Sequence, residues 1–328
     1  MKDFRFYCFF IILVVFSVAT PIVASFNMFF GLIFLICFIL TAFITIQLYV
    51  NFLFWPFPSW IDTSQVTIRE VEVPSKIEGK NLRAILLRNK LSHPDEKQIG
   101  VLFHHGYRGK IERVYKYAIP LAVYGCTILC IDARGHGKSK EKGFSMNDFI
   151  GILSDVENEI TFLENLDGVD KNKLCMMGIS MGAQMSLTGG YQDQRIKKVV
   201  GISGTYDILE MLRRHKTVVT KRIYKNITKK DKDDLESWNK KVSAKYFFEK
   251  KSSIPDKDRV YLVHGKEDNL VIFKEALLAR AALNLPDTNV LFLDKPEKKY
   301  TLSAHGLTGQ ETIVSAFLIK IIEALKKS

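Results

Sequence analysis

Residues 6–55 contain no Asp, Glu, Lys or Arg, and this stretch restricts what the chain can fold into more than any other feature. A helix needs about 20 consecutive apolar residues to cross the hydrocarbon core of a bilayer, so the stretch is long enough for two crossings. The segment PIVASFN at 21–27 places Pro, Ser and Asn between two runs rich in Phe, Ile, Leu and Val. We therefore expect residues 1–61 to be a membrane anchor, with a transmembrane helical hairpin of about 7–24 and 29–51.

Positive charges flank this stretch on both sides, and none lies in its central turn. Lys2 and Arg5 precede it, and Arg69, Lys76 and Lys80 follow it. Because Lys and Arg are enriched on the cytoplasmic side of membrane spans, the pattern predicts a multi-pass protein of the cell membrane with the rest of the chain on the cytoplasmic side. One alternative is a signal peptide that ends near Ala19 or Ala24, after which the second apolar run would still stop in the membrane as a single span. The other alternative is a fully secreted product.

The formal net charge is +12, and the pI is about 9.3. Such a basic chain attracts either nucleic acid or an anionic membrane surface. The sequence contains no RNP-like aromatic motif, helix-turn-helix pattern or zinc-finger spacing. The bilayer is therefore the expected partner and nucleic acid is not, while the oligomeric state is left open.

The cysteines have no C-x-x-C spacing, so they predict neither a disulfide framework nor a zinc site. We expect those outside the apolar leader to be small buried side chains, and we expect no metal or organic cofactor. The five are Cys8, Cys37, Cys126, Cys130 and Cys175.

After residue 62, β-rich runs alternate with helical patterns. Two strands in succession, followed by strand and helix in alternation, predict an α/β domain over 62–328. Its sheet should be mostly parallel, with about eight strands and helices on both faces. The expected strands are 66–73, 81–88, 100–104, 126–131, 173–179, 198–203, 259–264 and 289–293, and the expected helices are 111–123, 149–166, 181–190, 271–284 and 310–326.

Residues 205–257 separate two expected strands by far more than an ordinary loop, and they favour helix. They hold 15 Lys and Arg against 8 Asp and Glu, so about +7 of the charge is concentrated here. We interpret this interval as a basic helical lid. Arg214, Lys221, Arg222 and Lys225 can form one basic stripe if a single helix carries them. The stripe either faces an anionic surface or an acidic substrate, or is only a solvated face.

The sequence Gly178-Ile179-Ser180-Met181-Gly182 fits G-x-S-x-G, after an expected strand and before an expected helix. In that setting the motif makes a tight turn that exposes a serine hydroxyl, and glycines are needed on both sides because side chains there would collide. Ser180 is therefore the candidate nucleophile.

A serine hydroxyl needs a base to take its proton and a carboxylate to orient that base. Asp268 follows the expected strand 259–264, at the edge where parallel sheets hold their sites. His305 is the last histidine of the chain and lies between the last strand and the last helix. We expect Asp268 and His305 to complete a triad with Ser180. Glu267 is the competing acid, and His215 in the lid is the reserve base.

A small glycine loop, HHGYRG, ends the expected strand 100–104. Such a loop can aim a backbone N–H at a developing oxyanion, and the residue after the nucleophile can supply a second donor. We assign these donors to Tyr107 and Met181. His104 and His105 are expected to shape the loop.

With HHGYRG, DARGHGKS at 132–139, GISMGA at 178–183, HGKED at 264–268 and His305, the chain resembles the α/β-hydrolase superfamily. Within it the sequence is similar to the branch of monoacylglycerol lipases, lysophospholipases and related esterases. The resemblance covers about residues 66–326. It implies acyl transfer to water through an acyl-enzyme, and it implies that DARGHGKS shapes the pocket wall beside the nucleophile. The membrane hairpin and the basic lid depart from that branch.

The hypothesis from sequence is a membrane-tethered serine hydrolase that cleaves a carboxylic ester, with a small-molecule or lipid-like substrate. One alternative is a peptidase or thioesterase that uses the same triad, and another is a non-enzymatic binding protein.

Overall fold

The computed structural model describes residues 32–33, 35–43, 62–93, 96–214, 218–230, 234–249, 255–294, 305, 307 and 309–327. The chain divides into two compact units, Met1–Pro56 and Phe57–Ser328. Residues 32–33 and 35–43 of the first unit are helical, and most of the expected hairpin lies outside the described residues. Among the residues described, no helix is both long and apolar enough to cross a bilayer.

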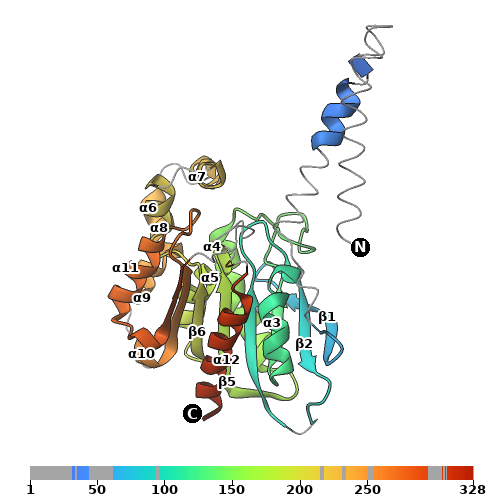
Figure 1. The fold of residues 1–328 in the computed structure, drawn as a ribbon, viewed down its shortest axis with the longest axis vertical. Coiled ribbons are helices and arrows are strands. Elements are labelled where there is room, and N and C mark those ends of the chain that lie inside the picture. The colour runs from blue at the N-terminus through green and yellow to red at the C-terminus, as the bar shows by residue number, and fades with distance from the viewer. Residues whose placement is uncertain are drawn as a thin grey trace. The chain divides into compact units, whose positions relative to one another are not determined.

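An eight-stranded sheet forms the centre of the second unit (Figure 1). Its order is β1-β2-β4-β3-β5-β6-β7-β8. β2 is antiparallel to both β1 and β4, and the other neighbouring strands are parallel. This confirms the mostly parallel sheet expected from sequence. The strands are β1 (Val66–Pro74), β2 (Asn81–Asn89), β3 (Gln98–His104), β4 (Thr127–Ile131), β5 (Val169–Ile179), β6 (Ile196–Ile202), β7 (Val260–Gly265) and β8 (Val290–Leu293).

β3, β4 and β7 are buried along their whole length, whereas the edge strand β1 is mostly exposed. Continuous burial is what a parallel sheet requires when helices cover both of its faces. β5 begins four residues earlier than expected, because Val169 and Asp170 pair with Gln98 and Ile99 of β3 before the register shifts.

Helices cover the sheet on both faces (Figure 1). α3 (Tyr115–Val123), preceded by the short turn η1 (Ile111–Arg113), and α12 (Glu311–Lys327) pack together over one face. α4 (Phe149–Glu164), α5 (Met181–Met185) and α11 (Phe273–Leu283) lie with the lid, and the turn η2 (Ser186–Gly190) continues α5. The buried apolar side chains accordingly form two clusters, one with α3 and α12 and one with α4, α5 and the lid. Another short turn, η3 (Asp287–Asn289), leads into β8.

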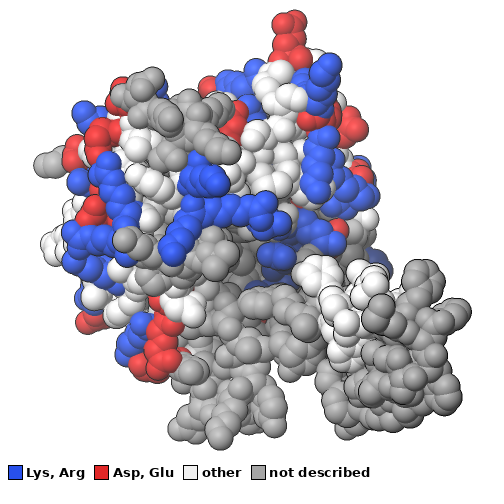
Figure 2. Space-filling view, turned by 90° about the horizontal axis from the view of Figure 1, so that it is seen from above, with Lys and Arg blue, Asp and Glu red and all other residues white. Residues whose placement is uncertain are grey.

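The described residues of the interval 205–257 are mostly helical, as expected of a lid. It contains α6 (Ile208–Arg214), α7 (Val218–Lys230), α8 (Leu235–Val242), α9 (Ala244–Phe248) and the start of α10 (Asp256–Arg259). The expected basic stripe is therefore divided between two helices, with Arg214 at the end of α6 and Lys221, Arg222 and Lys225 exposed on α7. Figure 2 shows the molecule from above, and on the face seen there Lys and Arg side chains form a band across the middle.

The lid segment closes on itself and is fastened to the sheet domain. The backbone N–H of Lys245 donates to the carbonyl of Tyr206 at 2.9 Å, so the chain returns at Lys245 to the point where the lid begins. Glu275 of α11 accepts the N–H of Tyr206, and Gln184 of α5 donates to the carbonyl of Val242 at 2.7 Å. The base of the lid is thereby bound to the helix that follows Ser180.

Candidate active site

Ser180 occupies the sharp turn between β5 and α5, with φ at 56° and ψ at −113°. A Cβ on Gly178 would lie 2.1 Å from the carbonyl carbon of Gly182, and a Cβ on Gly182 would lie 2.4 Å from the carbonyl oxygen of His104. Neither position has room for a side chain. The two glycines are therefore needed because a larger residue would collide with the neighbouring backbone. The strained serine backbone is typical of a nucleophile presented at the end of a strand.

Asp268 and His305 form a hydrogen bond, with 2.8 Å between Oδ2 of Asp268 and Nδ1 of His305. Asp268 lies in the loop after β7 and is buried. Its Oδ1 accepts the backbone N–H groups of Leu270 and Val271, each at 2.9 Å. Two backbone donors therefore orient the carboxylate, and its other oxygen faces His305. A proton on Nδ1 of His305 leaves Nε2 as the basic nitrogen.

Burial raises the pKa of Asp268, but the hydrogen bond and charge of His305 outweigh it and hold the pKa below its ordinary value. His264 lies with Nε2 at 3.4 Å from Oδ2 of Asp268 and at 2.8 Å from the carbonyl oxygen of Val271. Burial lowers the pKa of His264, so its ring is neutral and its Nε2–H donates to Val271. Asp268 therefore remains ionised at neutral pH.

Ser180 and His305 are both attached to the end of β6. The N–H of Ser180 donates to the carbonyl of Ile202 at 2.8 Å. The next residue, Ser203, donates from its hydroxyl to the carbonyl of His305 at 2.9 Å. Ser203 itself has φ at 52°, outside the strand conformation. Two consecutive residues thus tie the candidate nucleophile and the candidate base to one strand end.

The Gly106–Tyr107 peptide lies directly against Ser180, because a Cβ on Gly106 would be 3.3 Å from Cβ of Ser180. The carbonyl of Gly106 accepts from Nδ1 of His105 and from the N–H of Gly109, both at 2.8 Å. In a trans peptide the N–H points opposite to the carbonyl. The Tyr107 N–H is therefore held in a fixed direction, as an oxyanion donor would need to be.

His105 fixes this peptide as a neutral ring. Burial lowers the pKa of His105 to about 3. Its Nε2 accepts the backbone N–H of Ala133 at 3.2 Å, so the proton is on Nδ1, from which it reaches the carbonyl of Gly106. The loop-shaping role expected of this histidine is what the structure shows.

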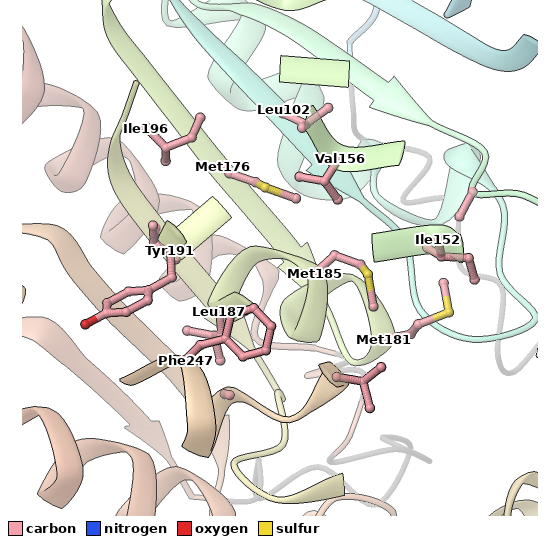
Figure 3. Packing of buried hydrophobic residues seen from close by; sticks show 14 of the residues in the cluster. Leu102, Ile152, Val156, Met176, Met181, Met185, Leu187, Tyr191, Ile196 and Phe247 are labelled. Atoms are coloured by element: carbon pink, nitrogen blue, oxygen red, sulfur yellow. The ribbon is translucent and has the colours of Figure 1, made fainter. Parts of the chain in front are cut away.

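Met181 begins α5, and the first N–H groups of a helix have no acceptor within that helix. Its side chain points away from the strand end, toward Ile152 and Met185 in the apolar cluster (Figure 3). The backbone of Met181 is thus anchored next to Ser180. Its role as the second oxyanion donor stays a prediction.

Glu267, the competing acid, is exposed, whereas Asp268 is buried against His305. The geometry therefore favours Asp268. His215, the reserve base, lies outside the described residues.

The segment 132–139 is an internal scaffold. Asp132 accepts from the N–H groups of Ile111 and Lys138, and Arg134 binds Asp155 through two nitrogens. The ring of His136 packs edge-on against Tyr107, with 5.9 Å between the two ring centroids.

Several buried contacts were missed from sequence because their partners are far apart in the chain. His104 binds Glu159 of α4 at 2.6 Å, with both side chains fully buried, directly behind the turn that holds Ser180. Burial raises the pKa of Glu159. The bonds from Ser203 to His305 and from Gln184 to Val242 are of the same kind.

Within the described ranges, no group of three or more His, Cys, Asp or Glu side chains is arranged to hold a metal ion.

The chain matches the family model described as serine aminopeptidase, S33 over residues 95–266, which is more than half of its 328 residues. A curated relative, thiohydrolase apmlB of Arthrinium phaeospermum, is 27% identical over 128 residues that cover 39% of this chain. The chain matches only 42% of the length of that relative.

Similar solved structures include an acetyl xylan esterase from Paenibacillus sp. R4, with a TM-score of 0.58, 16% identity and coverage of 82% of this chain and 86% of that one. An acylaminoacyl peptidase from Pyrococcus horikoshii has a TM-score of 0.58 and 15% identity, with coverage of 78% of this chain and 42% of that one. At these identities the likeness shows the fold. Together with the family match, it establishes that the chain belongs to the serine aminopeptidase S33 family of α/β hydrolases.

Proposed function

We propose that this protein is a serine hydrolase that cleaves carboxylic esters with lipid-like or other acyl groups, through Ser180, His305 and Asp268. The observation that carries the proposal is the hydrogen bond from His305 to a buried Asp268, at the sheet edge where the strained backbone of Ser180 presents its hydroxyl. Family membership supports the same reaction class.

In the proposed first step, Oγ of Ser180 attacks the ester carbonyl carbon while Nε2 of His305 takes the hydroxyl proton. Asp268 holds Nδ1–H and stabilises the imidazolium that forms. The N–H groups of Tyr107 and Met181 bind the carbonyl oxygen as it becomes negative. Collapse of the tetrahedral intermediate breaks the ester C–O bond, and His305 returns its proton to the departing alcohol.

Water completes the cycle. His305 takes a proton from a water molecule, whose oxygen attacks the acyl-serine carbonyl. The second tetrahedral intermediate releases the carboxylic acid, and the proton returns to Oγ of Ser180. His305 accepts and returns the proton in both steps of this sequence.

An acyl substrate is supported by the apolar underside of the lid. Ile227 of α7 and Trp238 of α8 are buried in the same cluster as Met181. The ring of Trp238 packs edge-on against Phe149, with centroids 6.0 Å apart. Apolar side chains from the lid therefore cover the helix that carries Ser180, and acyl chains are the substrate groups that such a surface favours.

A thioester is the second candidate bond, because the curated relative that shares part of this sequence is a thiohydrolase. The same acyl-enzyme would form, with a thiol as the leaving group. The choice between ester and thioester depends on the alcohol or thiol side of the substrate.

We also propose that residues 6–55 anchor the enzyme in the cell membrane, with its catalytic domain on the cytoplasmic side. The proposal rests on the absence of charged side chains from that stretch and on the positive residues that flank it.

A fluorophosphonate probe tests whether the protein is an enzyme. We expect covalent labelling of the full-length protein in detergent, and we expect Ser180→Ala to abolish it. A folded protein that is not labelled would favour a binding protein. Assays of matched esters, thioesters and peptide amides on the same preparation would then identify the bond, and faster cleavage of amides would replace our ester assignment with a peptidase.

A further inference from the structure

One side-chain oxygen connects the loop of Tyr107 to the lid. Oδ1 of Asn147 accepts the hydroxyl of Tyr107 at 2.7 Å. The same oxygen accepts Nδ2 of Asn226, on α7, at 3.4 Å. An amide oxygen has two lone pairs and can accept both donors. Asn147 thus joins two segments that are 119 residues apart in the chain.

Tyr107 is held firmly enough for this bond to affect its backbone. Its ring stacks on Phe149, with centroids 6.2 Å apart and an interplanar angle of 19°. The ring of His136 packs against it edge-on. The carbonyl of Gly106 is fixed by His105, and the hydroxyl bond to Asn147 is a second anchor of the Gly106–Tyr107 segment. Together the two anchors set the direction of the Tyr107 N–H beside Ser180.

Asn147 itself stands on a rigid support. The next residue, Asp148, is the N-cap of α4 and accepts the N–H of Gly151 at 3.1 Å. Asp148 also binds Arg134, whose guanidinium is fixed by Asp155. The position of Asn147 is therefore set by contacts within the sheet domain.

The bond from Asn226 is the longer of the two and comes from a helix that packs through apolar contacts. Ile227, next to Asn226, is buried, and Ile223 is half-buried against the same cluster. A long neutral hydrogen bond is weaker than one at 2.7 Å. Displacement of α7 would consequently break the Asn226 bond first and leave the bond to Tyr107.

We infer that Asn147 is a positioning residue, which holds the oxyanion donor Tyr107 in place and couples it to the docked position of α7. This inference rests on the proposed function, since it assigns a task to the Tyr107 N–H. Asn147 does not touch the substrate and acts through Tyr107. Docking of α7 then strengthens the arrangement that stabilises the transition state.

The test compares three single variants with two double variants in the full-length protein. The single variants are Tyr107→Phe, Asn147→Ala and Asn226→Ala, and the double variants combine Asn147→Ala with each of the other two. Tyr107→Phe removes one oxygen and keeps the stacked ring, so it is the variant least able to disturb the fold. We measure the rate of fluorophosphonate labelling of Ser180, and kcat and KM on a short water-soluble ester. Asn158→Ala, on α4 rather than in the turn before it, is the matched control because Asn158 bonds the carbonyl of Pro74, on the edge strand β1.

Tyr107→Phe and Asn147→Ala should each lower the labelling rate and kcat by about 3- to 10-fold, the range expected for one hydrogen bond, with KM nearly unchanged. The double variant Tyr107→Phe/Asn147→Ala should lose no more than the worse single variant, because both changes remove the same bond. Asn226→Ala should cause a smaller loss, and none in the Asn147→Ala background.

Independent losses that add in the double variants, or a rise in KM alone, would show that these residues only stabilise the fold. Labelling of wild type and all variants at one rate would also overturn the assignment to Asn147 and leave the proposed function intact. Failure of the probe to label Ser180 in the wild type would instead contradict the proposed function itself.

Discussion

Nδ1 of His305 lies 2.8 Å from Oδ2 of Asp268, although 37 residues separate them in the chain. The contact forms because the loop after β7 places Asp268 at the carboxyl end of the sheet, and Ser203 holds the backbone of His305 at the end of β6. Adjacent parallel strands therefore bring together side chains whose positions in sequence are unrelated.

The first prediction concerns the triad. Ser180→Ala, Asp268→Asn and His305→Ala should each lower kcat by several orders of magnitude, because the three groups act as a unit. Steady-state kinetics on a soluble ester provides the measurement, with circular dichroism to confirm the fold. Glu267→Gln is the matched control and should lose little, since Glu267 is exposed. A collapse there would transfer the acid role to Glu267, and normal turnover in His305→Ala would remove His305 as the base.

The second prediction is a pH dependence of stability caused by Asp268. Its pKa in the folded protein lies below the ordinary value of about 3.9. The unfolded chain therefore binds a proton more readily, so the contribution is fully present above that ordinary value and is lost as pH falls through the folded pKa.

Urea unfolding measured between about pH 5 and pH 3 should accordingly show a steeper loss of unfolding free energy in the wild type than in Asp268→Asn, which has no proton to bind at that position. Parallel curves for the two proteins would show that Asp268 gains no stability from His305.

The third prediction concerns the turn around the nucleophile. Gly178→Ala should destabilise the protein strongly and abolish probe labelling, because the new Cβ would lie 2.1 Å from the backbone of Gly182. Gly79→Ala is the control: its φ is +70°, but no atom lies within 4 Å of the added Cβ. We expect it to cost about 1 kcal/mol for the positive φ and to leave labelling intact. Equal melting temperatures for the two variants would contradict this account of the turn.

The fourth prediction concerns the exposed basic residues of α7. Replacing Lys221, Arg222 and Lys225 by Gln should lower activity on an ester embedded in anionic vesicles and leave activity on a short soluble ester nearly unchanged. Each such charge contributes about 1 kcal/mol near an anionic leaflet, and salt screens it. The variant should consequently respond less to added salt.

A control variant removes three lysines elsewhere, Lys171, Lys326 and Lys327, which lie at the start of β5 and the end of α12. It should retain vesicle activity. Equal losses on vesicles in both variants would indicate a general charge effect, and equal loss on both substrates in the α7 variant would indicate a structural role for that helix.

The fifth prediction is that high salt does not extract the protein from membranes, whereas detergent does, because residues 6–55 are rich in apolar side chains and carry no charge. Protease added to sealed cells should leave the catalytic domain intact if it faces the cytoplasm. Digestion of the domain without lysis would reverse the proposed topology.

The sequence was most informative where local patterns carry the signal. All eight strands were predicted within a few residues, because buried β-rich runs such as 127–131 are bounded by clear turns. The turn at Ser180 was predicted from its glycines, since steric exclusion there depends on neighbours in sequence. The helix expected at 111–123 is instead a short turn followed by α3, a difference within the accuracy of helix boundaries.

Contacts between distant segments could not be predicted, because residue type alone does not identify the partner. The carboxylate of Glu159 could have faced solvent, yet it lies buried against His104. Asn147 and Asn226 have no motif that marks them as a pair. The order of the strands, with β4 between β2 and β3, also depends on how the chain crosses over the sheet.

The junction between Lys245 and Tyr206 has a consequence for how such enzymes can diversify. Because the N–H of Lys245 bonds to the carbonyl of Tyr206, the intervening residues leave and return to the sheet domain at almost one point. Extending a closed loop adds little chain entropy: each doubling of its length costs only about 0.6 kcal/mol. The segment between these residues can therefore change in length and charge at small cost to stability. The strand ends that hold Ser180, Asp268 and His305 need not change with it.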